Sequence, residues 1–290
     1  MKKLFYLCVL MLFIGVLSAC TTQNAPAALE DADETLTIVS IGPAITEVLV
    51  AIGVGDKIIA TDDFSAIVPG VPANVPTINM MAIDVETIIM LSPDIVIATE
   101  MITFAGDPLA LVAEMGARVV YVPQHNSISG IIDNIHFIAE EMSAIEAGQT
   151  LTQNMQAEIN KVRAIAETIP ESRTVYFEID PSPFTFGEGS FLHEILELIG
   201  AVNIFADIPP WTLIADEQIL TRNPEVILTN VSWLDDPINE IKSRPGWDSL
   251  NAVINSRVYL IDTDSSSRDN HNIVKAMWEI ARAVYPDYFN

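Results

Sequence analysis

A thirteen-residue unit that occurs twice constrains this chain more than any other feature. Its copies are residues 85 to 97 and residues 216 to 228. In each copy a glutamate, Glu86 or Glu217, opens a short amphipathic run, and a proline follows seven residues later. An acidic residue and a largely β-branched apolar segment complete the unit. This order is typical of a short helix that leads into a buried parallel strand.

Two further similarities keep the same order along the chain. Residues 45 to 53 resemble residues 192 to 200, and residues 118 to 121 resemble residues 257 to 260 more weakly. The copies lie 131 to 147 residues apart, which is far longer than the period of a solenoid repeat. We therefore predict an α/β protein of two Rossmann-like lobes, joined by one long α-helix, with a ligand cleft between them.

The long helix is predicted between the two halves of the repeat. Apolar residues recur there at intervals of four, four, three, four and three, which draws one stripe along a helix. The stripe consists of Leu151, Met155, Ile159, Val162, Ala166 and Ile169. We assign the linking helix to residues 146 to 170, the N-terminal lobe to residues 35 to 145 and the C-terminal lobe to residues 171 to 290. A rod of roughly 30 Å predicts that the lobes flex only slightly.

The N-terminus has the pattern of an export signal. Two lysines precede an apolar run that is too short to span a bilayer comfortably, and residues 17 to 20 read Leu-Ser-Ala-Cys. This tetrapeptide resembles a bacterial lipobox, so we predict a signal peptide over residues 1 to 19 and lipidation of Cys20. The alternative is an ordinary signal peptide with an incidental cysteine. The other cysteine, Cys8, lies inside the signal, which leaves the mature protein without a disulfide.

The segment after the signal is predicted to be a tether. Residues 20 to 34 are rich in alanine and acidic residues and show no periodicity, as expected of a flexible linker. We therefore expect the protein on the extracytoplasmic face of the cell membrane, held there by its lipid anchor alone.

A strongly acidic composition limits the partners of this protein. The chain has 14 basic and 39 acidic residues, and removing residues 1 to 19, which hold two lysines and no acid, leaves a net charge of −27. Such a surface repels nucleic acids and anionic lipid headgroups, so neither is expected as a partner. A neutral or basic partner is favoured.

The sequence contains no recognisable catalytic or metal-binding motif. Its four histidines follow no metal-ligand spacing, and no nucleophile elbow, phosphate-binding loop or dinucleotide turn is present. We therefore predict no enzyme activity, no catalytic residue, no bound metal and no cofactor. His125 alone follows a predicted strand, where it could bind a metal centre such as haem iron. A surface-anchored metal-dependent enzyme and an adhesion lipoprotein are the alternatives from other classes.

Large side chains in predicted loops indicate a ligand site. Six aromatic residues fall in such loops, where core packing gives no obvious reason for a large ring: Phe64, Phe104, Phe184, Phe186, Trp211 and Trp233. Rings of this kind stack on flat or apolar ligands, although some can pack beneath their own loops. Met80, Met81 and Met101 offer an adaptable apolar wall, or else belong to the core.

One arginine is a further candidate. Arg268 is the only cation in the predicted loop over residues 262 to 270. Its five donors suit amides or carboxylates on the rim of a ligand, and the alternative is a salt bridge to Asp264 or Asp269.

The two glutamates of the repeated unit have two interpretations. Glu86 and Glu217 each lie in the first turn of a predicted helix, a position that the helix dipole already favours. If both are exposed, they form a matched acidic pair that suits two-point docking onto a symmetric basic dimer.

With these features in place, the chain resembles the solute-binding proteins of ABC importers for vitamin B12, siderophores and haem. The similarity covers residues 35 to 290, and its most specific stretches are residues 40 to 47, 86 to 97, 184 to 190, 203 to 205, 211 to 224 and 244 to 247. The resemblance implies a two-lobed, monomeric binding protein that captures a metal chelate and delivers it to an ABC permease dimer with its ATPase subunits. It also implies that Glu86 and Glu217 dock on arginines of the two permease subunits.

The vitamin B12-binding branch is the most similar part of that family. The residues that match its ligand contacts are Phe64, Phe184, Trp211, Asp264 and Arg268, with Met80 and Thr99 at two positions that are aromatic in the branch. The resemblance therefore implies a corrinoid ligand first, with a ferric siderophore and then haem as alternatives. An anionic siderophore would need more cations than Arg268, and haem would need a tyrosine or histidine ligand, for which only His125 is well placed.

Overall fold

The computed structural model describes residues 36 to 289. The predicted signal peptide, the tether over residues 20 to 34 and the lipidation site Cys20 lie outside these residues. Within the described part, no helix is both long enough and apolar enough to cross a membrane.

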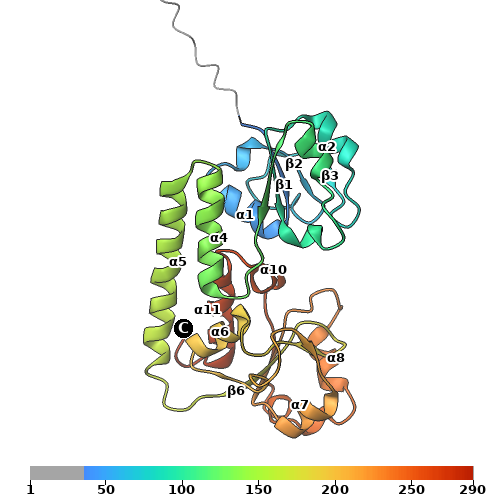
Figure 1. Cartoon of the computed structure of the whole chain (residues 1–290). Coiled ribbons are helices and arrows are strands. Elements are labelled where there is room, and N and C mark those ends of the chain that lie inside the picture. The colour runs from blue at the N-terminus through green and yellow to red at the C-terminus, as the bar shows by residue number, and fades with distance from the viewer. Residues whose placement is uncertain (1–35, 290) are drawn as a thin grey trace, which may run out of the picture. The chain divides into compact units, whose positions relative to one another are not determined.

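The first half of the chain forms one α/β lobe (Figure 1). Its strands are all parallel and follow the order β3-β2-β1-β4-β5. They are β1 (Ile38–Ile41), β2 (Ile58–Asp62), β3 (Thr77–Ile78), β4 (Ile95–Thr99) and β5 (Arg118–Val122), with helices α1 (Pro43–Ala51), α2 (Val85–Leu91), α3 (Ala110–Glu114) and α4 (Ile128–Glu141) and the 3-10 turns η1 (Gly55–Lys57) and η2 (Glu100–Thr103). Because the strands are parallel, their C-terminal ends meet at one edge, where open α/β sheets bind ligands.

The second half repeats this plan with a smaller parallel sheet of order β11-β10-β6-β8. Its strands are β6 (Thr174–Glu178), β8 (Val202–Asn203), β10 (Val226–Thr229) and β11 (Val258–Leu260), and β7 (Phe184–Thr185) and β9 (Thr212–Leu213) form a separate antiparallel pair. Its helices are α6 (Phe191–Leu198), α7 (Asp216–Arg222), α8 (Pro237–Ser243), α9 (Asn251–Ile254), α10 (Thr263–Ser267) and α11 (Ile273–Val284), with the 3-10 turn η3 (Trp247–Ser249). Two α/β lobes with parallel sheets confirm the predicted fold class.

The repeated unit forms the same structure in both lobes. Helices α2 and α7 each end at a residue in the left-handed conformation, Ser92 with φ of 46° and Asn223 with φ of 44°. The proline that follows has no backbone N–H and cannot continue the helix. The chain therefore turns directly into a buried strand, β4 in the first lobe and β10 in the second.

The acid after each proline holds two neighbouring strands together. Asp94 accepts hydrogen bonds from the backbone N–H and the hydroxyl of Thr37, at 2.7 and 2.6 Å. Glu225 accepts the same pair from Thr174, at 2.9 and 3.2 Å. Each threonine lies at the beginning of a central strand, β1 or β6. The similarity between the two copies of the unit therefore has a shared structural cause at the N-terminal edge of each sheet.

Helix α5 (Ile145–Ala166) connects the lobes and packs on both of them. It lies beside α4 of the N-terminal lobe (Figure 1) and also contacts α6 and α11 of the C-terminal lobe. The helix ends four residues before the predicted residue 170, because the chain closes into a turn in which the N–H of Ile169 donates to the carbonyl of Ala166. Ile169 still packs against the core, as its place in the apolar stripe predicted.

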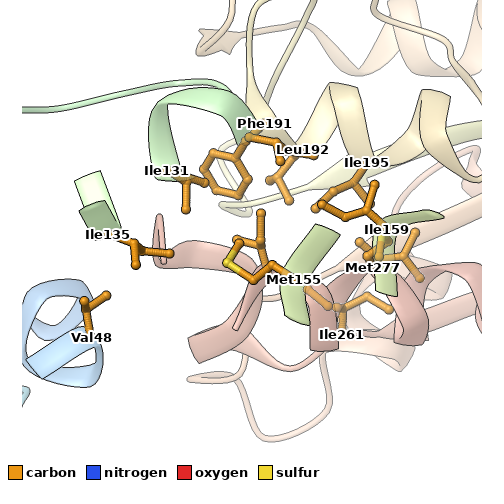
Figure 2. Close-up of a cluster of buried hydrophobic side chains, with 14 of the residues drawn as sticks. Val48, Ile131, Ile135, Met155, Ile159, Phe191, Leu192, Ile195, Ile261 and Met277 are labelled. Atoms are coloured by element: carbon orange, nitrogen blue, oxygen red, sulfur yellow. The ribbon is translucent and has the colours of Figure 1, made fainter. Parts of the chain in front are cut away.

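The stripe of α5 lies in a core that both lobes share. Met155, Ile159 and Val162 are almost completely buried. Figure 2 shows Met155 and Ile159 among side chains from both lobes: Val48 of α1, Ile131 and Ile135 of α4, Phe191, Leu192 and Ile195 of α6, Ile261 directly after β11, and Met277 of α11. The lobes are therefore joined by a continuous apolar layer as well as by the connecting helix. Such a layer resists large relative movement.

Two helices of the N-terminal lobe differ from the ranges that the sequence predicts, which are residues 131 to 142 and residues 107 to 115. Helix α4 begins at Ile128 instead of residue 131, because the Ser127 hydroxyl caps it by accepting a hydrogen bond from the N–H of Gly130 at 3.1 Å. Helix α3 covers only Ala110–Glu114 of the predicted helix over residues 107 to 115.

The predicted loop over residues 262 to 270 contains helix α10. Asp262 begins this helix, because its carboxylate accepts hydrogen bonds from the N–H and the hydroxyl of Ser265, at 2.9 and 2.6 Å. The sequence Asp-Thr-Asp-Ser held this capping signal, and its polar composition obscured it. As a result, Arg268 lies at the end of a helix and is held in a defined position.

Truncation of the shared core tests this architecture. Met155→Ala should lower the free energy of unfolding by about 2 to 5 kcal/mol, because the side chain is removed from a packed interior. The matched control is Gln153→Ala, an exposed position on the same helix, which should change it by less than about 0.5 kcal/mol. Urea denaturation followed by circular dichroism measures both, and equal effects would contradict a core built on α5.

Candidate functional site

An open pocket of about 150 Å³ lies where the strand ends of the N-terminal lobe meet the end of α10. Its lining residues are Gly42, Pro43, Ala44, Ile45, Val48, Met80, Thr99, Met101, Val122, Pro123, Asn134, Ile135, Ile138, Ser267, Arg268 and Asp269. Three of the predicted site residues, Met80, Thr99 and Arg268, are brought together here. We call this the inner pocket.

A second, more open pocket of about 390 Å³ lies on the other side of Arg268. It is lined by Glu47, Val50, Ala51, Ile67, Val68, Pro69, Asp264, Arg268, His271 and Asn272. We call it the outer pocket. The predicted residue Asp264 belongs to this pocket, whereas Phe64, Phe184 and Trp211 line neither.

A buried aspartate holds the turn between β1 and α1, which lines the inner pocket. Gly42 has φ of 135°, a conformation that other residues rarely adopt, and it links β1 directly to α1. The fully buried Asp62 accepts the N–H of Gly42 at 2.8 Å and the N–H groups of Phe64 and Ser65 at 2.9 and 3.1 Å. One carboxylate therefore fixes both the pocket floor and the loop that carries Phe64.

Arg268 is held by two carboxylates. It forms ion pairs with Glu47 of α1 and, at 2.7 Å, with Asp264. The pairing with Asp264 is the alternative that the sequence left open, whereas Glu47 was not predicted as a partner. Glu47 also accepts hydrogen bonds from the side chains of Asn270 and Asn272, at 2.6 and 2.7 Å. This network joins α1 of the first lobe to the segment between α10 and α11 of the second.

A reciprocal contact joins the lobes a second time. Glu194 of α6, which corresponds to Glu47 in the repeat, accepts a hydrogen bond from the N–H of Ile128 at 2.8 Å. Ile128 is the first residue of α4, so the carboxylate also lies at the positive end of that helix dipole. Each lobe therefore offers one glutamate to the beginning of a helix that packs on α5.

The predicted ligand-binding aromatics divide into exposed and packed rings. Phe64 is 57% exposed, Phe104 87% and Trp233 59%, so these rings are accessible. Met81 is 87% exposed, whereas Met80 and Met101 line the inner pocket. Exposed apolar side chains of this kind are available to an apolar ligand face.

Phe186 was a candidate for an accessible loop position, but its side chain is completely buried. Its ring packs edge-on against Phe177 and Trp211, with centroids 5.6 and 6.1 Å apart. The antiparallel pairing of β7 with β9 folds this segment back onto the core, which sequence alone did not predict.

Trp211 and Phe184 are half-buried. The Trp211 ring also contacts Phe191, and its indole N–H donates to Asn126 in the loop after β5, at 3.1 Å. Trp211 therefore links the C-terminal lobe to the N-terminal lobe. Because it packs on the core, its removal would also cost stability, which makes it a less selective probe of the ligand site than Phe64.

Asp269 is a site residue that sequence reasoning treated only as a partner of Arg268. Asp269 lines the inner pocket. Burial raises the pKa of Asp269 to about 6, and its own backbone N–H and the nearby His125 oppose this rise. The carboxyl therefore changes charge close to neutral pH.

The glutamates of the repeated unit are both exposed. Glu86 is the second residue of α2 and Glu217 the second residue of α7. These carboxylates lie at equivalent positions of the two lobes, and among residues 36 to 289 neither forms an ion pair. Because both are exposed, they meet the condition for a matched acidic pair.

The histidines do not gather into a metal site. His193 is buried beside Asn203, burial lowers the pKa of His271, and His125 is half-buried in the loop after β5. Among the residues that the structure describes, no three histidine, cysteine or acidic side chains lie close enough together to hold a metal ion.

Removal of the Asp269 charge should stabilise the empty protein at neutral pH. The folded-state pKa of about 6 exceeds the ordinary value of 3.8, so the neutral form stabilises the fold below pH 3.8 and this contribution is lost as pH rises through 6. Asp269→Asn resembles the neutral form, so its Tm should exceed that of wild type by about 2 to 4 °C at pH 7.5. The difference should disappear near pH 4. Calorimetry at both pH values measures it, and a pH-independent difference would contradict the raised pKa of Asp269.

Several known proteins are similar to this chain. A family model described as periplasmic binding protein matches residues 38 to 265. The chain is 30% identical over 283 residues to the uncharacterized ABC transporter substrate-binding lipoprotein YvrC of Bacillus subtilis, covering 92% of this chain and 88% of that protein. It is 27% identical over 275 residues to a vitamin B12-binding protein of Vibrio cholerae, covering 93% and 96%.

A solved structure of a similar protein has the same fold. A possible iron-binding, periplasmic solute-binding protein from Staphylococcus epidermidis superposes with a TM-score of 0.77 at 26% identity, over 86% of this chain and 98% of that one. With the family match spanning residues 38 to 265, this chain belongs to the periplasmic binding protein family.

Proposed function

We propose that this protein is an extracytoplasmic solute-binding lipoprotein that captures a metal chelate, with a corrinoid as the favoured ligand, and delivers it to an ABC permease dimer. Cys20 carries the lipid anchor in this proposal, and the protein acts as a monomer that makes and breaks no covalent bond. The observation that carries it is the inner pocket, in which Met80, Thr99 and Arg268 meet between the two lobes of a periplasmic binding protein fold.

The relatives support a metal chelate as the ligand class. Their names include a vitamin B12-binding protein and a possible iron-binding protein. The lipoprotein name of the Bacillus subtilis relative supports the anchor at Cys20, and the exposed pair Glu86 and Glu217 supports docking to a two-subunit permease.

The inner pocket is too small to enclose a whole corrinoid. Pockets that enclose a whole drug-sized ligand hold roughly 300 to 1,000 Å³, whereas this one holds about 150 Å³. An edge or a side group of a corrinoid would enter it, and the remainder would lie over the rim. Phe64, in the loop that Asp62 holds next to Gly42, is 57% exposed, so its ring is accessible for stacking on a flat ligand.

Direct titration tests the ligand. Residues 21 to 290 should bind cyanocobalamin more tightly than haemin or ferric siderophores, measured by calorimetry and by the visible spectrum. Phe64→Ala should weaken binding about fivefold or more, because one stacked ring contributes about 1 kcal/mol or more beyond its area.

A matched control separates ring stacking from general loss of apolar surface. Ile254 is 64% exposed and lies in α9, before the N-terminal end of β11. Ile254→Ala should leave affinity unchanged. If Phe64→Ala binds as tightly as this control, Phe64 does not contact the ligand, and if no chelate binds the wild type, the proposed function is wrong.

A double variant tests docking. Glu86→Ala with Glu217→Ala should leave ligand affinity unchanged and abolish ligand uptake, because both contacts with the permease lose their charge. The control pair is Asp133→Ala with Glu140→Ala, two exposed acids of α4, which removes the same charge elsewhere. Uptake in cells and binding to the reconstituted permease measure the effect. Normal uptake by the Glu86 and Glu217 variant would refute the docking role.

A further inference from the structure

The charges around the two pockets are unevenly distributed. Of the lysines and arginines in residues 36 to 289, only Arg268 lines either pocket. Three carboxylates line them, namely Glu47, Asp264 and Asp269. The surroundings of a bound ligand therefore carry a net negative charge at neutral pH.

The one arginine is already neutralised. Arg268 pairs with Glu47 and, at 2.7 Å, with Asp264, and its side chain is only 14% exposed. An anionic ligand would have to displace one of these carboxylates, which would leave that carboxylate without its partner. Breaking a partly buried ion pair in this way is unfavourable.

The inner pocket instead presents hydrogen-bond acceptors. Apart from its own backbone N–H, no described group donates to the carboxylate of Asp269. Asn134 is 95% buried, with a residual exposure of 5%. Its amide N–H donates to the carbonyl of Pro123 at 2.8 Å, and both residues line the inner pocket. No described residue donates to the side-chain oxygen of Asn134. Two acceptors in one small pocket therefore lack a donor.

We infer that Asp269 and Asn134 form an acceptor subsite that selects chelates bearing an N–H donor, and this inference rests on the proposed function. An amide or ammonium group of the ligand would enter the inner pocket and donate to the two oxygens. Neutral or cationic chelates are favoured as ligands, and polyanionic chelates are disfavoured. A hydrogen bond to a charged acceptor is stronger than one between neutral groups, so Asp269 is the dominant residue of the subsite.

A charge series of probes tests this inference. The probes are cyanocobalamin, which is neutral and rich in amides; a ferric trishydroxamate with one free ammonium group; the same chelate with that amine acetylated; a trianionic ferric tris-catecholate; and haemin. Calorimetric titration of residues 21 to 290 should give the tightest binding with one of the first three. Tightest binding of the tris-catecholate or of haemin would overturn the inference while leaving the proposed function intact.

A variant tests the residue itself. Asp269→Asn should weaken the tightest-binding probe about tenfold or more, whereas Asp63→Asn should not. Asp63 is an exposed acid beside Phe64 that lines neither pocket, so it removes the same charge without touching the subsite. Equal affinities of the two variants would overturn the inference. Failure of the wild type to bind any of the five probes would instead refute the proposed function.

The pH dependence of ligand affinity separates a role of Asp269 in the subsite from a general loss of stability. The ionisable groups around Asp269 and Arg268 are His125 from the loop after β5, the two partners of Arg268, Glu47 and Asp264, and His271, which lines the outer pocket. Affinity of the wild type should fall between pH 7.5 and pH 5, as the Asp269 carboxylate gains a proton. His125→Gln should retain this fall and Asp269→Asn should lose it. A full fall in Asp269→Asn would overturn the inference.

Discussion

The continuous apolar layer around α5 is the constraint on which the rest of this structure depends. Met155 and Ile159 pack among residues of α1, α4, α6 and α11, so the core does not stop at the boundary between the lobes. Close packing resists movement once the lobes are in place, but burial is non-directional and does not by itself select which polar groups of the two lobes meet. The orientation therefore needs polar contacts in addition to the apolar core.

Two glutamates supply those polar contacts. Glu47 reaches from the first lobe to Arg268, Asn270 and Asn272, and Glu194 reaches from the second lobe to the N–H of Ile128. Their equivalence follows from the internal repeat. Because Arg268 lies between the inner and outer pockets, the contact that orients the lobes also decides the charge that a ligand meets. Fold and selectivity are thus coupled through one ion-pair network.

The sequence predicted the parts of this protein that depend on local periodicity. The stripe of α5 and the two copies of the helix and strand unit were predictable because burial repeats at fixed intervals along a helix or strand. The site was only partly predictable, because its contacts join distant residues: Glu47 and Arg268 are separated by 221 positions. The burial of Phe186 was not predictable, because it depends on the pairing of β7 with β9. Asp269 was considered only as a partner of Arg268, because its surroundings come from the other lobe.

The hydrogen bond from the Trp211 indole to Asn126 has an optical consequence. It crosses from one lobe to the other, and the indole is otherwise surrounded by Phe186 and Phe191. Separation of the lobes would hydrate this ring and shift its fluorescence emission to longer wavelength, whereas closure over a ligand would have the opposite effect. The protein therefore carries an intrinsic fluorophore at a contact between its lobes, and the contribution of Trp211 to the emission can follow capture and release without an added label.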